Sequence, residues 1–223
     1  MSGRDILGLV LSYLFAFGLI GLAEAVRAWR GWPTEFTRKV IHIAAGSWVI
    51  AIIYIFEHWW WGVVPTASFV ILNYIFYRFT IFKAMDARGS TPGTVYFALS
   101  ITILLLLLWP RGQEGIVAVG VMPMTWGDAF ASLIGVRWGR HRYEALGSRR
   151  SWEGSAAMFV FSLLATFVVL LLVGLPLSPA EGFLYSFLMA LGATLVEAFS
   201  PWGLDNLSVP FFSTGLLYLL LAA

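Results

Sequence analysis

The sequence GIVAVGVMPMTWGDAFASLIGVRWGR occupies residues 115–140 and combines a long apolar run with one acidic side chain, Asp128, and two arginines near its end. Residues 115–136 are long enough to cross a bilayer, because a membrane-spanning helix needs about 20 predominantly apolar residues. An ionisable side chain inside such a span costs roughly 2.5 kcal/mol or more, and it usually has a partner or a function. This stretch therefore predicts a transmembrane helix that carries a carboxylate with a specific task.

The rest of the chain has the composition of an integral membrane protein. Of its 223 residues, 60% are hydrophobic and only 12% are charged. The apolar runs predict an all-α, single bundle of about seven or eight transmembrane helices, and we expect residues 1–223 to form one domain. The expected spans cover about 5–27, 39–56, 59–77, 94–109, 115–136, 154–174, 181–199 and 207–222. The last span is short and could be re-entrant.

Two features of the composition limit which kinds of site the protein can contain and how it is oriented in the membrane. The chain has no cysteine, which excludes disulfides, iron–sulfur clusters and thiolate zinc sites. Twelve of its 14 cationic side chains follow the first, third and fifth spans: Arg27, Arg30, Arg38, Lys39, Arg78, Lys83, Arg88, Arg137, Arg140, Arg142, Arg149 and Arg150. The positive-inside rule assigns these connections to the cytoplasm and the amino terminus to the outside. Each of these cations, taken singly, can be explained by its role in setting the orientation of the protein in the membrane.

The earliest motif is Arg38-Lys39-x-x-His42, at the start of the second span. Arg38 and His42 are four residues apart and share a helical face, which brings cations and a hydrogen-bonding ring to the membrane surface together. Arginine and lysine suit phosphate. His42 fits a substrate contact and an interhelical hydrogen bond equally well. Gly93 and Thr94 open the fourth span and could bind an anion at a helix amino end, although an N-cap explains them equally well.

A ridge of small residues accompanies Asp128. Gly127, Ala131, Gly135 and Gly139 recur every four residues and allow a helix or a ligand to approach the backbone closely. A buried carboxylate beside such a ridge suits Mg²⁺, which uses only one or two protein carboxylates together with substrate phosphates. Helix packing alone is the alternative explanation for the glycines.

Two further polar tracts fall on the same predicted face. In Arg149-Arg150-Ser151-Trp152-Glu153, Ser151 is expected to cap the sixth span, and the helix dipole favours an acidic residue at Glu153. The two arginines suit a triphosphate. After the seventh span come Glu197 and Asp205-Asn206, in a loop that has no lysine or arginine. These acids are expected to ligate a metal or to accept a hydroxyl proton, although Asp205-Asn206 could also only cap the last helix.

Together these motifs resemble the membrane-embedded CTP-using lipid enzymes, namely the polyprenol, phytol and dolichol kinases and the related phosphatidate cytidylyltransferases. The resemblance runs from Arg38-Lys39-x-x-His42 through Gly93-Thr94, Asp128-x-x-Ala131-x-x-x-Gly135-x-x-x-Gly139-Arg140 and Arg150-Ser151-x-Glu153-Gly154-Ser155 to Glu197 and Asp205-Asn206-x-x-x-Pro210.

The ends of the chain favour the kinase branch of this group. The Lys-Asp, His-Gly-Gly and Asp-Arg-x-Asp segments that usually close a cytidylyltransferase are absent from the sequence. The closing Glu197 and Asp205-Asn206-x-x-x-Pro210 resemble the phytol and polyprenol kinase pattern. These kinases often have lysine where this chain has Arg150, and arginine keeps the positive charge.

The resemblance implies a transferase of lipid metabolism that moves the γ-phosphate of CTP to the hydroxyl of a long isoprenoid alcohol, at the cytoplasmic face of a cell membrane. It implies three overlapping groups of site residues. The expected catalytic residues are Asp128, Glu153 and Asp205. The expected ligands of magnesium are Asp128, Glu197 and Asp205. The expected nucleotide-binding residues are Arg38, Lys39, His42, Gly93, Thr94, Gly135, Gly139, Arg140, Arg149, Arg150, Ser151 and Asn206.

Three rival functions remain open on the sequence. A phosphatidate cytidylyltransferase would use the same nucleotide and metal but would make a CDP-lipid. A CTP-dependent diacylglycerol kinase is a near variant of the favoured reaction. A small transporter or scaffold would use Asp128 and Glu24 to pair with arginines inside the bundle. None of these functions involves nucleic acid.

Overall fold

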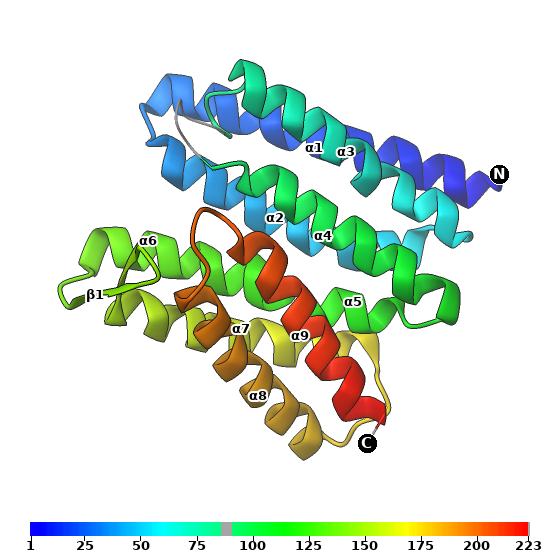
Figure 1. The fold of residues 1–223 in the computed structure, drawn as a ribbon. Coiled ribbons are helices and arrows are strands. Elements are labelled where there is room, and N and C mark those ends of the chain that lie inside the picture. The colour runs from blue at the N-terminus through cyan, green and yellow to red at the C-terminus, as the bar shows by residue number, and fades with distance from the viewer. Residues whose placement is uncertain (86–90, 223) are drawn as a thin grey trace.

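The computed structural model describes residues 1–85 and 91–222 and is predominantly helical (Figure 1). Within these residues, eight helical segments are long and apolar enough to cross a membrane, which confirms the predicted multi-spanning α-helical protein. Arg88, which the topology argument includes, lies outside the described residues. The segments are Gly3–Arg30 (α1), Thr34–Ile55 (α2), Trp59–Phe79 (α3), Gly93–Leu108 (α4) extended by the 3-10 turn Trp109–Arg111, Glu114–Trp138, Trp152–Val173 (α7), Pro179–Ala198 (α8) and Asp205–Ala222 (α9). With 18 residues, α9 is long enough to cross the membrane completely.

Local sequence signals explain where several of these helices begin and end. Ser2 caps α1 and forms a capping box with Asp5, and Ser178 forms the same motif with Glu181 at the start of α8. Gly31 ends α1 in the left-handed region, with φ at 67°. These short-range interactions satisfy backbone groups that the helix ends would otherwise leave unpaired.

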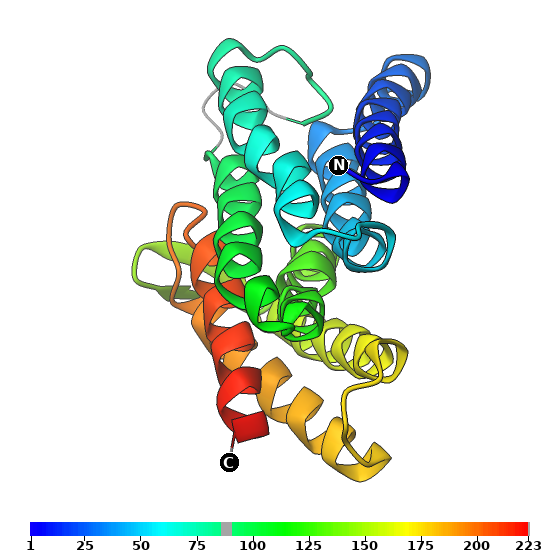
Figure 2. The ribbon, with the colours of Figure 1, turned by 90° about the vertical axis from the view of Figure 1, so that its right-hand side faces the viewer.

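The helices form two groups that meet around one central segment. Figures 1 and 2 both show α1 and α3 on one side of the bundle and α7 and α8 on the opposite side. The segment Glu114–Trp138 passes between the two groups. In its most apolar stretch 78% of the residues are buried, against 22% for α1, so the residues around Asp128 belong to the core of the bundle.

The central segment is interrupted directly before Asp128, where the sequence predicted an uninterrupted span. It consists of α5 (Glu114–Gly120), the π-helical turn Pro123–Asp128 and α6 (Ala129–Trp138). Pro123 has no amide hydrogen and cannot continue the α-helical ladder. The hydroxyl of Thr125 donates to the carbonyl oxygen of Val121 at 2.8 Å. Gly46 of α2 faces Thr125, and a larger side chain at position 46 would collide with it. The interruption therefore fixes the depth and direction of Asp128.

The connection between α6 and α7 contains a hairpin that the sequence analysis did not predict. Strands Arg142–Ala145 (β1) and Ser148–Ser151 (β2) pair antiparallel, with Tyr143 opposite Arg150. The two turn residues, Leu146 and Gly147, both have positive φ values of 46° and 79°, which match a tight hairpin turn. The hairpin projects beyond α6 (Figure 1) and delivers Arg149 and Arg150 to the start of α7.

The structure shows how two features noted in the sequence pack. Gly135 of α6 lies against Gly154 of α7, so the small-residue ridge does bring two helices close together. Glu24 pairs with Arg27 at 2.6 Å and also accepts a hydrogen bond from the amide of Ala84 at 2.7 Å. The hydrogen bond from Ala84 ties α1 to the segment that follows α3.

Candidate active site

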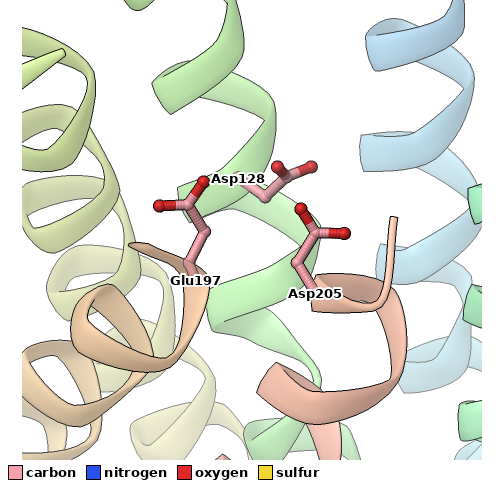
Figure 3. A group of neighbouring side chains, drawn as sticks. All are labelled: Asp128, Glu197 and Asp205. Atoms are coloured by element: carbon pink, nitrogen blue, oxygen red, sulfur yellow. The ribbon is translucent and has the colours of Figure 1, made fainter. Parts of the chain in front are cut away.

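Three carboxylates converge inside the bundle. Asp128 ends the π-helical turn, Glu197 lies in the last turn of α8, and Asp205 begins α9. Each offers one oxygen, and these atoms all lie within 4.8 Å of one another. Figure 3 shows the three side chains extending from separate helices toward a common centre. Their residues are only 3–6% exposed, so three acidic groups are concentrated in a largely buried site.

Two cations face these carboxylates. The ammonium group of Lys39 lies 2.6 Å from Oδ2 of Asp128, and Lys39 is itself buried. The guanidinium of Arg150 reaches Oε1 of Glu197 at 2.9 Å and Oδ2 of Asp205 at 3.2 Å. With all side chains ionised, three negative charges meet two positive ones. The cluster thus retains an excess negative charge that favours a further cation.

Arg150 also fixes the backbone between α8 and α9. One of its terminal nitrogens, Nη2, donates to the carbonyl oxygens of Glu197 and Ser200, at 3.3 and 3.2 Å. Burial lowers the pKa of Arg150, but the neighbouring Glu197 and Asp205 carboxylates outweigh it and raise the pKa above its ordinary value. The guanidinium is therefore permanently charged. Its Nε is buried and has no hydrogen-bond partner among the described residues, so it is available to a ligand.

The loop between α8 and α9 positions Asp205. Trp202 and Gly203 both adopt positive φ values, 53° and 79°, which reverse the chain sharply after α8. Asn206 then donates from its backbone amide and from its side-chain nitrogen to Oδ1 of Asp205, at 2.9 and 2.8 Å. Oδ1 is held by Asn206 while Oδ2 faces Arg150, so the orientation of this carboxylate is defined from both sides.

The carboxylates open onto a polar cleft of about 440 Å³. That volume falls within the range of small-molecule sites, roughly 300–1,000 Å³. Besides the three acids, the lining includes seven residues that the sequence analysis assigned to nucleotide binding. They are Arg38, Lys39, Gly135, Arg149, Arg150, Ser151 and Asn206. Segments from four distant parts of the sequence thus meet at one cationic cleft with an acidic floor.

Several expected site residues lie elsewhere. His42 and Thr94 line a neighbouring apolar cavity and not the polar cleft. Nε2 of His42 donates to the carbonyl oxygen of Met124 at 3.0 Å, which is the interhelical hydrogen bond considered as the alternative for this residue. Gly93 does not line the cleft either, but its missing side chain makes room for Asn206.

Glu153 also differs from its expected place beside Asp128. Its carboxylate accepts from Nδ1 and the backbone amide of His141, at 2.7 and 3.2 Å, because the hairpin brings His141 over the first turn of α7. Glu153, Gly139 and Arg140 are absent from the lining of the cleft. Ser151 does cap α7, with its hydroxyl accepting from the amide of Gly154 at 3.1 Å.

The structure adds polar residues that sequence reasoning missed. Glu35 pairs with Arg38 at 2.9 Å and accepts from the hydroxyl of Ser132 at 2.5 Å, which orients Arg38 at the edge of the cleft. The spacing of three residues between Glu35 and Arg38 is the signal that could have found this pair. Thr91 and Arg142 also line the cleft, and no motif in the sequence distinguishes them.

Comparison with known proteins places the chain among lipid kinases. No family model and no solved structure matches it. A phytol kinase from Synechocystis sp. is 36% identical over 212 residues, covering 92% of this chain and 87% of the relative. A probable chloroplastic phytol kinase from Triticum aestivum is 27% identical and covers 92% of the chain and 74% of the relative. A CTP-dependent diacylglycerol kinase from Schizosaccharomyces pombe is 27% identical over 141 residues, covering 60% of the chain and 62% of the relative.

The similarity to the Synechocystis enzyme, at 36% identity, covers 92% of this chain and 87% of that relative. The chain therefore belongs to the phytol kinase family.

Proposed function

We propose that the chain is a CTP-dependent kinase that phosphorylates the hydroxyl of a long-chain isoprenoid alcohol of the phytol or polyprenol type. The relatives are named as phytol kinases and as a CTP-dependent diacylglycerol kinase, which supports a lipid alcohol as acceptor and CTP as donor. Residues 1–223 act as one domain in this proposal, because the cleft needs helices from both halves of the chain.

The cluster of Asp128, Glu197 and Asp205 at the floor of a cationic cleft is the observation that carries the proposal. A triphosphate needs cations along its length and a centre that neutralises the transferring phosphoryl group. Arg38, Lys39, Arg149 and Arg150 line one continuous cleft together with the acids. Arg149 is exposed and Arg150 has an unpartnered Nε, so both can take part in phosphate binding.

The same cluster fits Mg²⁺. Its donors are carboxylate oxygens, which magnesium prefers, and they outnumber the cations that face them. Asp128 and Glu197 would hold the ion, which leaves Asp205 to act on the alcohol. Bound there, magnesium would supply positive charge to the phosphate oxygens.

The proposed reaction is a direct phosphoryl transfer. The alcohol oxygen forms a bond to the γ-phosphorus, and the bond from this phosphorus to the β,γ-bridging oxygen breaks, with its electron pair leaving on CDP. The hydroxyl proton passes to a carboxylate, for which Asp205 is the best candidate because Asn206 and Arg150 fix its orientation. Lys39 and Arg150 stabilise the charge that develops, and most of the acceleration comes from such positioning and electrostatics.

A label-transfer experiment tests this function. Purified protein is incubated with CTP labelled at the γ-phosphate or in the base, and with phytol, farnesol, a polyprenol, diacylglycerol or phosphatidate. We expect γ-label on an isoprenoid alcohol and no base label in the lipid fraction. Base label in a CDP-lipid would identify a cytidylyltransferase, and transfer only to diacylglycerol would identify the diacylglycerol kinase variant. Either result overturns the proposal.

We place the cleft on the cytoplasmic side of a cell membrane, because the cation-rich connections lie on the side of the hairpin. The chain contains no cysteine, so single cysteines report orientation cleanly. Leu146→Cys in the hairpin should resist a membrane-impermeant thiol reagent in intact cells, while Glu57→Cys, between α2 and α3, should react. The opposite labelling pattern would reverse the orientation.

A further inference from the structure

A second cavity lies beside the polar cleft, and its lining is mostly apolar. It has a volume of about 120 Å³ and is enclosed by α1, α2, α3 and α4. Most of its lining is aliphatic or aromatic, including Leu19, Ile41, Trp48, Phe69 and Ile101. A water molecule in such a space needs polar partners, and most of this wall offers none. The cavity therefore suits a hydrocarbon.

The two spaces adjoin. Arg38 is part of the lining of both the cavity and the cleft. His42, one turn further along α2, lines the cavity, and its bond to Met124 places it beside the π-helical turn that carries Asp128. A molecule lying in the cavity with one end at Arg38 therefore ends next to the acidic cluster.

Polar groups without partners occur at this end of the cavity. Oδ1 of Asn73 and the hydroxyl of Thr94 are buried and have no hydrogen-bond partner among the described residues. Both residues line the cavity, and Asn73 is only 8% exposed. The side-chain nitrogen of Asn73 donates to the carbonyl oxygen of Thr94 at 3.1 Å, which holds the two groups together. Because a buried polar atom without a partner is costly, such a pair indicates a ligand that can donate and accept a hydrogen bond.

We infer that the cavity between α1 and α4 binds the part of the hydrocarbon tail next to the hydroxyl of the lipid alcohol, with the hydroxyl at Asn73 and Thr94. This inference rests on the proposed function for the identity of the alcohol. Oδ1 of Asn73 accepts a hydrogen bond from the hydroxyl group, and the Thr94 hydroxyl donates one to its oxygen. From there the alcohol passes Arg38 to meet the γ-phosphate in the cleft. Nucleotide and acceptor thus approach the acids from two separate spaces.

Two matched substitutions in α1 separate an effect on the cavity from an effect of added bulk on the helix. Ala16 lines it, whereas Ala25 lies on an exposed part of the same helix outside it. Phenylalanine at position 16 fills part of the space that the tail would occupy. Ala25→Phe adds the same bulk to the same helix without entering the cavity. Both variants are first checked for monodisperse behaviour in detergent, and if Ala16→Phe aggregates, Ala45→Phe, which fills the cavity from α2, replaces it.

The test is photocrosslinking without nucleotide, so it does not depend on catalysis. A phytol analogue with a diazirine on the isoprene unit next to the hydroxyl is bound and irradiated, and the crosslinks are mapped by mass spectrometry. We expect crosslinks in α1 to α4, at least a tenfold loss of labelling in Ala16→Phe, and unchanged labelling in Ala25→Phe. Crosslinks confined to α7, α8 or α9, or equal labelling of the two variants, would overturn the inference. Transfer of γ-label to phytol, measured on the same wild-type preparation, reports the proposed function separately.

Discussion

Replacing Arg150 with methionine should strongly impair the site. Methionine preserves much of the side-chain volume but removes the charge that faces Glu197 and Asp205. Both acids are buried, and their carboxylates lie 2.9 and 3.2 Å from the guanidinium. Hydrogen bonds to charged groups contribute about 1.5–3 kcal/mol each. Two such bonds correspond to about 3–6 kcal/mol, which overlaps the range of about 3–5 kcal/mol for removing one partner of a buried ion pair.

The side chain of Arg150 is 26% exposed, so the lower end of this range applies. If about 3 kcal/mol is lost from transition-state stabilisation, the rate falls roughly 100-fold, since each 1.36 kcal/mol is a factor of ten. Arg150→Lys keeps the charge but cannot span both acids, so we expect an intermediate loss of about tenfold.

The assay is steady-state γ-phosphate transfer from CTP to phytol, with all three proteins compared at equal amounts of monodisperse material. The order wild type, lysine variant, methionine variant is expected for kcat/KM. If Arg150→Met is folded and retains activity within about threefold of wild type, the guanidinium does not organise the acidic cluster and our reasoning fails.

Three further substitutions test other parts of the structure. Lys39→Met removes the partner of Asp128 and should lower γ-phosphate transfer about 100-fold, because a buried carboxylate loses its counter-charge. A loss no larger than that from replacing a lysine on the exposed surface would contradict this role. Gly46→Leu collides with Thr125 at the π-helical turn and should lower stability by about 1–3 kcal/mol, seen as a reduced Tm in detergent, whereas an unchanged Tm would show that the turn can move aside. Thr94→Val removes one hydroxyl with little change in shape and should raise KM for phytol about tenfold while KM for CTP stays constant. A raised KM for CTP with an unchanged KM for phytol would instead show that Thr94 contacts the nucleotide.

The membrane fold could be predicted from the sequence because its signal is one-dimensional. Each span is a long apolar run, and the polar connections between the runs mark the helix ends closely. Even the last expected span, 207–222, which could have been re-entrant, corresponds to the full-length helix Asp205–Ala222. The clustering of charge at one end of the spans also follows from the alternation of connections, since every second connection lies on the same side of a bilayer.

The internal arrangement of the site could not be predicted in the same way. Lys39 and Asp128 are 89 positions apart, and their contact depends on how α2 packs against the π-helical turn. Residues on a helix differ in direction by about 100° from one position to the next, so small rotations decide which space a side chain lines. Thr91 lines the cleft, whereas Thr94, only three residues later, lines the apolar cavity. Glu153 was misplaced because the hairpin supplies His141 as its partner.

The most direct test of the central claim is γ-phosphate transfer by Asp128→Asn, measured beside Glu181→Gln. Both variants replace a carboxylate by an amide, but Glu181 lies in the first turn of α8, at the opposite end of that helix from Glu197. If the buried acids form the catalytic centre of a lipid kinase, Asp128→Asn should be folded and lose about 100-fold or more of the transfer rate, while Glu181→Gln stays close to wild type. Equal rates in the two folded variants would contradict the account.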